Sequence, residues 1–146
     1  MINRLKNLYT VERELYYEVP SFRGKDYILY NSSGKKLATL TSKGILYVHT
    51  GFTFDGCTPK FKITLGGKTF IIGTSDGCLG QDGYPLLFHA SLKHDVLCKI
   101  YSKNPSIYPR KTIDKEFQKD MKTVKWKWRG LYYSFVRLYA KIRGYK

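Results

Sequence analysis

The sequence predicts an α+β protein, in which an antiparallel β-meander over about residues 14–72 is followed by three helices packed on it. Two observations lead to this prediction. Short runs rich in β-branched and aromatic residues fill the first half, whereas apolar residues recur at steps of three and four from residue 87 onward. The 146 residues match one domain, and their 42% hydrophobic content can supply its core. We therefore expect a single domain, 1–146, with a β-rich half (14–72) and a helical half (87–142).

Strand-like segments occupy most of the β-rich half, and turn residues bound each of them. The segments are ELYYEV (14–19), KDYILY (25–30), KLATL (36–40), GILYVHTGF (44–52), KFKITL (60–65) and KTFIIG (68–73). The stretches 31–34 (NSSG) and 66–67 (GG) separate neighbouring segments as hairpin turns do. We expect about five or six antiparallel strands. Residues 73–86 contain four glycines and a proline, which predicts a loop.

Three amphipathic helices are predicted after this loop. The first has the inward stripe Leu87, Ala90, His94, Leu97 and Tyr101. The second, with Thr112 as its N-cap, has the stripe Arg110, Asp114, Phe117 and Met121. The third runs from about Trp128 to Ile142 and has the apolar stripe Trp128, Leu131, Phe135, Leu138 and Ile142. We expect this last stripe to be buried, because the sheet needs a further cover for its apolar face. If the stripe is exposed instead, the helix should lie on a membrane or in the groove of a partner.

A histidine and an acid occupy the facing stripes of the first two helices. Helices joined by a short connection usually lie antiparallel, so His94 and Asp114 are expected to be hydrogen-bonded within about 3.2 Å and largely buried. In one interpretation both are catalytic: Asp114 orients the imidazole, and His94 acts as a general base toward water. In the other, they form a buried polar pair that holds two helices together. The sequence leaves both interpretations open.

Carboxylates near this pair predict that any bound metal is a hard cation. Asp55 lies in a bend between Gly51 and Pro59, and Asp95 points about 100° away from its neighbour His94 on the helix. Oxygen ligands favour calcium or magnesium, although Asp55 can equally cap its own β-turn. We expect no zinc, because His89 and His94 are five residues apart and do not form an i, i+4 pair. The absence of a glycine-rich phosphate motif argues against a nucleotide cofactor.

Three cysteines, Cys57, Cys78 and Cys98, are widely spaced and predict neither a disulfide framework nor a zinc module. Cys57 could serve as a nucleophile only if a base approached it. The opening residues lack the apolar core of a secretory signal, and no segment reaches the roughly 20 apolar residues of a membrane span. We therefore expect a protein that is neither secreted nor transmembrane.

Positive charge is concentrated at the C-terminal end of the chain. Residues 121–146 contain eight basic residues and no acid, so they carry +8 of the net charge of +15. The predicted anion-binding residues on the third helix are Arg129, Arg137, Lys141 and Arg143. Such a segment attracts nucleic acid, lipid phosphate or an acidic protein surface through a field that does not depend on sequence. We expect one of these anionic partners at residues 121–146.

Several of these motifs, taken in order, resemble a phage and prophage family called domain of unknown function 1353. They are Gly51-Phe52, Asp55-Gly56 with Thr58-Pro59, HASLKHD over 89–95, and RKTIDKEF over 110–117. The resemblance covers about residues 45 to 121 and implies a phage setting, hence the host cytoplasm or a virion, with other virion proteins as further partners.

A second resemblance is local and implies a mechanism. His94-Asp95, an aromatic at Tyr101, and then Arg110, Asp114 and Phe117 look like the paired catalytic helices of prokaryotic phospholipases A2. The resemblance implies that His94 is the base, Asp95 a calcium ligand and Asp114 the orienting residue, with the Asp55 bend as a calcium loop.

Two classes of function are therefore open. The first is a metal-assisted hydrolase of an ester or phosphoester, using His94 and Asp114 with Asp55 and Asp95 as metal ligands. The second is a non-enzymatic virion component or host-directed binding protein, in which the His94–Asp114 pair is structural. The basic segment 121–146 fits both classes.

Overall fold

A computed structural model describes residues 2–4, 9–54, 61–72, 82–84 and 86–145 of the chain. The strands are β1 (Ile2–Arg4), β2 (Tyr9–Thr10), β3 (Leu15–Glu18), β4 (Tyr27–Tyr30), β5 (Lys36–Leu40), β6 (Ile45–Val48), β7 (Thr53–Phe54), β8 (Phe61–Leu65) and β9 (Lys68–Ile72). The helices are the 3-10 turn η1 (Pro20–Phe22), α1 (Phe88–Lys103), α2 (Arg110–Thr123) and α3 (Arg129–Ile142). This element order confirms the predicted α+β class.

The described strands form three antiparallel sheets, whereas the sequence predicted one meander. The main sheet has four strands in the order β3-β6-β5-β4. β3 pairs with β6, Leu15 opposite Val48, so the first strand of this sheet joins the far edge of the β4-β5-β6 meander. β8 and β9 pair with β1, and β2 pairs with β7. The residue composition of each segment identifies it as a strand. Which strands pair depends on long-range contacts that local composition does not determine.

Both predicted hairpin turns are present. Asn31 stabilises the turn between β4 and β5, because its side-chain oxygen accepts hydrogen bonds from the N–H groups of Ser33 at 3.0 Å and Lys35 at 2.8 Å. Gly66 and Gly67 connect β8 to β9 with φ angles of 56° and 76°, a left-handed conformation that glycine adopts without strain. Local turn chemistry therefore sets these two connections.

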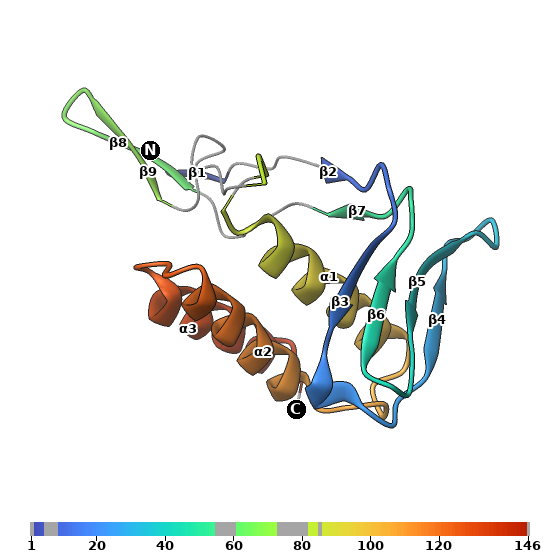
Figure 1. Cartoon of the computed structure of the whole chain (residues 1–146). Coiled ribbons are helices and arrows are strands. Elements are labelled where there is room, and N and C mark those ends of the chain that lie inside the picture. The colour runs from blue at the N-terminus through green and yellow to red at the C-terminus, as the bar shows by residue number, and fades with distance from the viewer. Residues whose placement is uncertain (1, 5–8, 55–60, 73–81, 85, 146) are drawn as a thin grey trace.

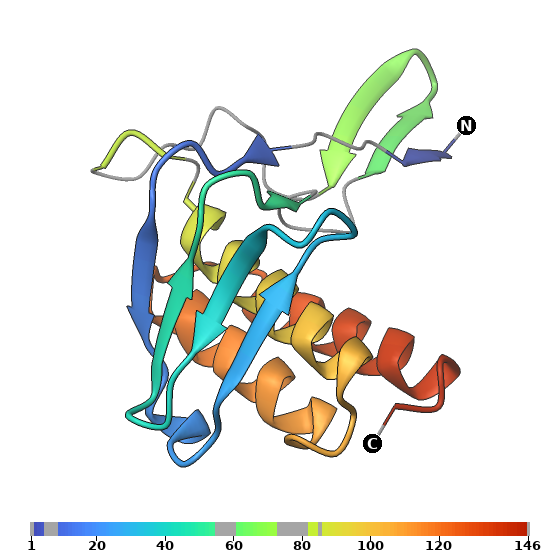
Figure 2. The same ribbon diagram turned by 90° about the vertical axis from the view of Figure 1, so that its right-hand side faces the viewer.

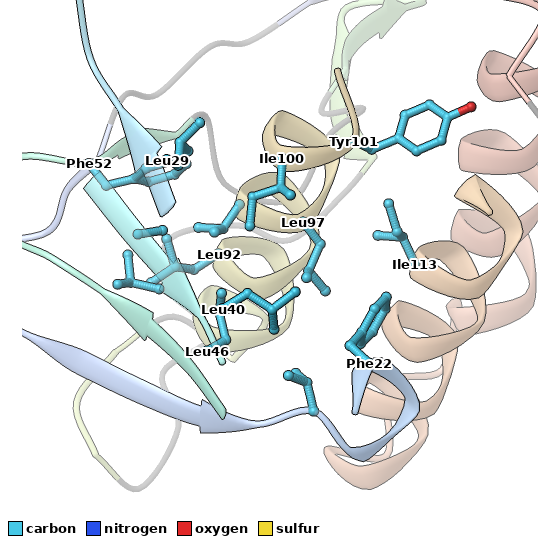
Figure 3. Close-up of a cluster of buried hydrophobic side chains, with 14 of the residues drawn as sticks. Phe22, Leu29, Leu40, Leu46, Phe52, Leu92, Leu97, Ile100, Tyr101 and Ile113 are labelled. Carbon is cyan, nitrogen blue, oxygen red and sulfur yellow. The ribbon is translucent and has the colours of Figure 1, made fainter. Parts of the chain in front are cut away.

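The molecule is layered, with the main sheet on one side, α1 against it, and α2 and α3 beyond α1 (Figures 1 and 2). Alternate residues of the central strands of the main sheet face α1, so Leu46 and Val48 of β6 are buried. Figure 3 shows the side chains of Leu40 and Leu46 in one cluster with those of α1 and with Phe22 of η1. The labelled members of this core are Phe22, Leu29, Leu40, Leu46, Phe52, Leu92, Leu97, Ile100, Tyr101 and Ile113.

The stripes predicted for the first two helices are confirmed. Every member of the first is buried: Leu87, Ala90, His94, Leu97 and Tyr101. Every member of the second is buried as well: Arg110, Asp114, Phe117 and Met121. The start of α2 was predicted wrongly, because Pro109 rather than Thr112 precedes the helix. The N–H of Thr112 already donates to the carbonyl of Pro109 at 3.0 Å, which places Thr112 inside the first turn.

The prediction that the apolar stripe of the third helix is buried is wrong. Trp128, at 59% exposure, and Ile142, at 76%, mark the two ends of a stripe that faces outward along its whole length. α3 instead packs through its opposite side, where Tyr132 and Ala140 are buried and Val136 is partly buried. These three residues recur every four positions and form a second stripe, smaller in volume, which fits the close approach to the neighbouring helix. None of the helices within the described ranges has the length and apolar character needed to cross a membrane.

Candidate functional site

Asp114 of α2 is the centre of a buried charge network that joins all three helices. Its Oδ1 accepts hydrogen bonds from His94 Nε2 of α1 at 2.9 Å and from Arg110 Nε of α2 at 3.0 Å. Its Oδ2 accepts from an Nη of Arg137 of α3 at 2.8 Å. Asp114 is 0% exposed and His94 8% exposed. The predicted hydrogen bond between His94 and Asp114 and the predicted burial are confirmed.

The helices position these side chains for simple geometric reasons. Arg110 and Asp114 are four residues apart on α2 and share one face. His94 lies in the middle of α1, which runs beside α2, so its ring reaches the same carboxylate and also packs against the ring of Phe117, centroid to centroid 4.7 Å. Arg137 lies beside the inward stripe of α3, and its side chain therefore turns toward the network.

The network shifts the ionisation of its members. Burial alone lowers the pKa of the His94 imidazole, but the sulfur of Cys98 and the carboxylates of Asp114 and Asp95 raise the pKa well above its usual value. Burial likewise raises the pKa of Asp114, but the hydrogen bond from His94 and the charge of Arg110 lower the pKa below its usual range. At neutral pH this part of the molecule therefore holds an imidazolium, two guanidinium groups and one shared carboxylate.

The remaining ring nitrogen of His94 faces α1 itself. His94 Nδ1 lies 3.7 Å from Asp95 Oδ1 and 3.8 Å from the Sγ of Cys98. A general base needs a neutral imidazole with one nitrogen open to water. Here the ring is protonated, nearly enclosed, and has charged or polarizable groups on both nitrogens, an arrangement that suits a fixed ionic link between helices.

Arg137 has a different place from the one predicted. The sequence assigned it to an exposed anion-binding patch, yet its guanidinium is already paired with Asp114. The other three predicted residues, Arg129, Lys141 and Arg143, are exposed. Helical periodicity could not have separated them, because Lys141 follows the buried Ala140 just as Arg137 follows Val136, yet Lys141 is exposed.

The metal-ligand prediction is only partly covered by the described residues. Asp95 is partly exposed, and although the sequence predicted that it points about 100° away from His94, its Oδ1 lies 3.7 Å from His94 Nδ1. Asp55, Cys57 and the rest of the bend as far as Pro59 lie outside the described residues. Within the part of the chain that the structure describes, no three or more His, Cys, Asp or Glu side chains come together as a metal-binding group.

A second buried ionic cluster was not predicted. Lys93, 8% exposed, places its Nζ 2.9 Å from Asp120 Oδ2 and 3.7 Å from Glu116 Oε1, linking α1 to α2. Ser21 of η1 donates to Glu116 at 3.2 Å. Burial raises the pKa of Asp120, although the charge of Lys93 opposes that effect. Periodicity gave no signal here, because a lysine in the middle of a helix is usually solvated.

His89 belongs to a third polar cluster that the sequence also did not reveal. Its Nε2 donates to Asp82 Oδ2 at 2.7 Å, and its Nδ1 accepts from the hydroxyl of Tyr17 at 2.6 Å. Burial is the main cause that raises the pKa of Tyr17 above its usual value, so the phenol stays protonated and donates. Both ring nitrogens are engaged, and the cluster holds β3 to the start of α1. Tyr17 and His89 are 72 residues apart, a separation at which local patterns give no signal.

The outward side of α3 is the remaining candidate. It exposes six large apolar or aromatic side chains, which we call the outward face of α3: Trp128, Leu131, Phe135, Leu138, Tyr139 and Ile142. Exposed basic residues border this face, and residues 121–146 contain no acid. An apolar and positively charged surface of this kind can bind a partner that offers both negative charge and apolar area.

Comparison with protein-family models, with curated proteins and with solved structures finds no match to this chain. The two family resemblances drawn from the sequence therefore stay predictions.

Proposed function

We propose that this protein is a non-enzymatic binding protein that attaches to an anionic partner through residues 121–146. The observation that carries the proposal is the position of the basic side chains on α3: Arg129, Lys141 and Arg143 are exposed. The segment contributes +8 and no negative charge, so its exposed basic residues attract phosphate or carboxylate, although Arg137 is paired with Asp114. In the phage setting that the family resemblance implies, the partner belongs to the virion or the infected host.

In this proposal the Asp114 network is structural. Both carboxylate oxygens of Asp114 accept charged hydrogen bonds, and the three donors come from α1, α2 and α3. Arg137 thereby anchors the inward side of α3, while the outward side stays available. The network supports the binding function by fixing the helix that carries the exposed charges.

The binding proposal is tested by the salt dependence of association with two polyanions, double-stranded DNA and vesicles containing an anionic lipid. We expect affinity to fall steeply as ionic strength rises, because bound counterions are released on association. A triple variant, Arg129→Gln, Lys141→Gln and Arg143→Gln, should flatten the dependence. The matched control neutralises three exposed lysines of the sheet side: Lys25→Gln, Lys36→Gln and Lys43→Gln. Equal behaviour of the two triple variants, or no salt-dependent binding by the wild type, would contradict the proposal.

A hydrolase is the second candidate, and the His94–Asp114 distance of 2.9 Å favours it. In that function His94 is the base above its raised pKa, where the imidazole is neutral, Asp114 orients it, and Asp55 and Asp95 hold calcium or magnesium. The test is hydrolysis of ester and phosphoester substrates with each cation, comparing the wild type with His94→Gln and Asp95→Asn. Turnover that requires His94 and calcium or magnesium establishes the enzyme. Calorimetry in which zinc binds tighter than calcium contradicts this metal assignment.

A further inference from the structure

The outward face of α3 exposes apolar side chains that electrostatic attraction to an anionic partner does not explain. Its members at steps of three and four, from Trp128 through Leu131 and Leu138 to Ile142, form one continuous stripe along the helix. Exposure reaches 55% at Leu138. Isolated exposed apolar residues are common on proteins, but a continuous stripe bordered by polar residues usually marks an interaction surface.

Positive charge flanks the stripe on both sides. Lys141 and Arg143 precede and follow Ile142, so each lies about 100° from it around the helix, in opposite directions. The Arg143 guanidinium carbon lies 5.4 Å above the ring of Tyr139, which keeps this charge at the margin of the aromatic surface. Long basic side chains at the margins of an apolar stripe can reach phosphates while their stems cover apolar surface.

The inward side holds the helix in place before any partner binds. Tyr132 is buried with Leu87, Ala90, Phe117 and Met121 in a separate apolar cluster, which we call the second core, and Arg137 is paired with Asp114. α3 therefore presents the stripe as a preformed surface, so binding does not have to supply the free energy of folding a helix. At 14 residues it is about 21 Å long, too short to cross a bilayer and sufficient to lie along one.

We propose that the outward face of α3 lies on an anionic lipid bilayer, with Leu131, Phe135 and Leu138 below the headgroups and the flanking basic residues at the phosphates. This inference rests on the proposed function and specifies its partner. Charge complementarity with lipid phosphate accounts for the basic margins, and the acyl boundary accounts for the stripe. Duplex DNA matches the charge but leaves the stripe in water, because phosphate contacts are made by polar groups.

The experiment compares sedimentation with neutral vesicles and with vesicles containing phosphatidylserine. The stripe variant is Leu131→Ser with Leu138→Ser, and its matched control is Tyr16→Ser with Ile28→Ser, two exposed apolar residues of the main sheet. We expect the stripe variant to bind anionic vesicles roughly tenfold or more weakly, since it removes the apolar surface that enters the interface. We expect its affinity for duplex DNA, and that of the sheet control for vesicles, to be unchanged.

Each other outcome has a defined meaning. Vesicle binding by the stripe variant that equals the wild type overturns the lipid inference. Binding of the wild type to DNA but not to vesicles also overturns it, while leaving the proposed anionic function intact. No salt-dependent binding to either polyanion overturns both proposals. Circular dichroism of the stripe variant checks that α3 is still folded, and Phe135→Ser supplies a single-site variant if the double variant unfolds.

Discussion

The two sides of α3 carry different chemistry on one helix. The inward side has modest apolar residues, Val136 and Ala140 among them, and one arginine that reaches a fully buried carboxylate. The outward side has larger apolar residues and basic neighbours whose charge is exposed. The side of α3 with more large apolar residues is therefore not the side that packs against the rest of the protein. Apolar periodicity finds two stripes, and only packing against α2 decides which one belongs to the core.

The largest effect is expected at the carboxylate that anchors the inward side. Asp114→Ala leaves His94, Arg110 and the tip of Arg137 without their shared negative partner, and removing one partner of a buried ionic network costs about 3–5 kcal/mol of unfolding free energy. Urea denaturation measures this loss. The control is Glu18→Gln, an exposed carboxylate on β3, which should change stability by less than about 0.5 kcal/mol. Similar losses for both variants would show that the network does not hold the helices.

A smaller effect separates the two sides of α3 directly. Ala140 is 0% exposed, so Ala140→Leu should cost about 1–3 kcal/mol through overpacking. Leu138→Ala, two residues earlier on the outward face, should stay within about 0.5 kcal/mol of the wild type. Thermal unfolding of both variants checks the contrast. A larger loss for Leu138→Ala than for Ala140→Leu would mean that the outward face is packed in the folded protein.

The pH dependence of stability tests the ionisation of the network. The folded-state pKa of His94 is raised above its unfolded value, so its contribution is complete below about pH 6.5 and is lost as pH rises through the folded pKa. The pKa of Asp114 is lowered, so its contribution is present above about pH 4 and lost at lower pH. We expect denaturation midpoints to decline from about pH 6.5 upward in the wild type. His94→Gln should show a flatter decline.

A control for this profile is Cys98→Ser, because the Sγ of Cys98 lies 3.8 Å from Nδ1 of the same ring. This variant should retain a decline with rising pH, since the hydrogen bond between His94 and Asp114 remains. A decline that disappears in Cys98→Ser and persists in His94→Gln would contradict the assignment of the pH dependence to His94.

The sequence was informative where local chemistry decides the outcome. The hairpin at Asn31, the buried stripe of α1 and the pairing of His94 with Asp114 follow from turn residues and helical periodicity. The partners of Arg137 and Lys93 were not predictable in this way. Each depends on how helices stack across layers, and an isolated basic residue on an amphipathic helix is normally assigned to solvent.

The same limit explains the error at α3. The larger stripe was assigned to the core because apolar volume is the usual signal for burial, and the prediction assumed that the sheet still lacked a cover. In the fold, α1 already covers the sheet, so α3 packs on the far side of the helical layer (Figure 2). Function can retain an exposed apolar face that stability alone would bury.

The most direct test of the central claim uses the two tryptophans as separate reporters. Trp128 is exposed at one end of the outward face of α3, whereas Trp126 packs against the second core. In a Trp126→Phe variant, tryptophan fluorescence therefore reports on Trp128 alone. We predict that its emission shifts to the blue and becomes protected from aqueous quenchers on phosphatidylserine vesicles at low salt, because the indole enters the interface. Emission and quenching that remain unchanged while the protein is bound to those vesicles would contradict the claim that α3 lies on the bilayer.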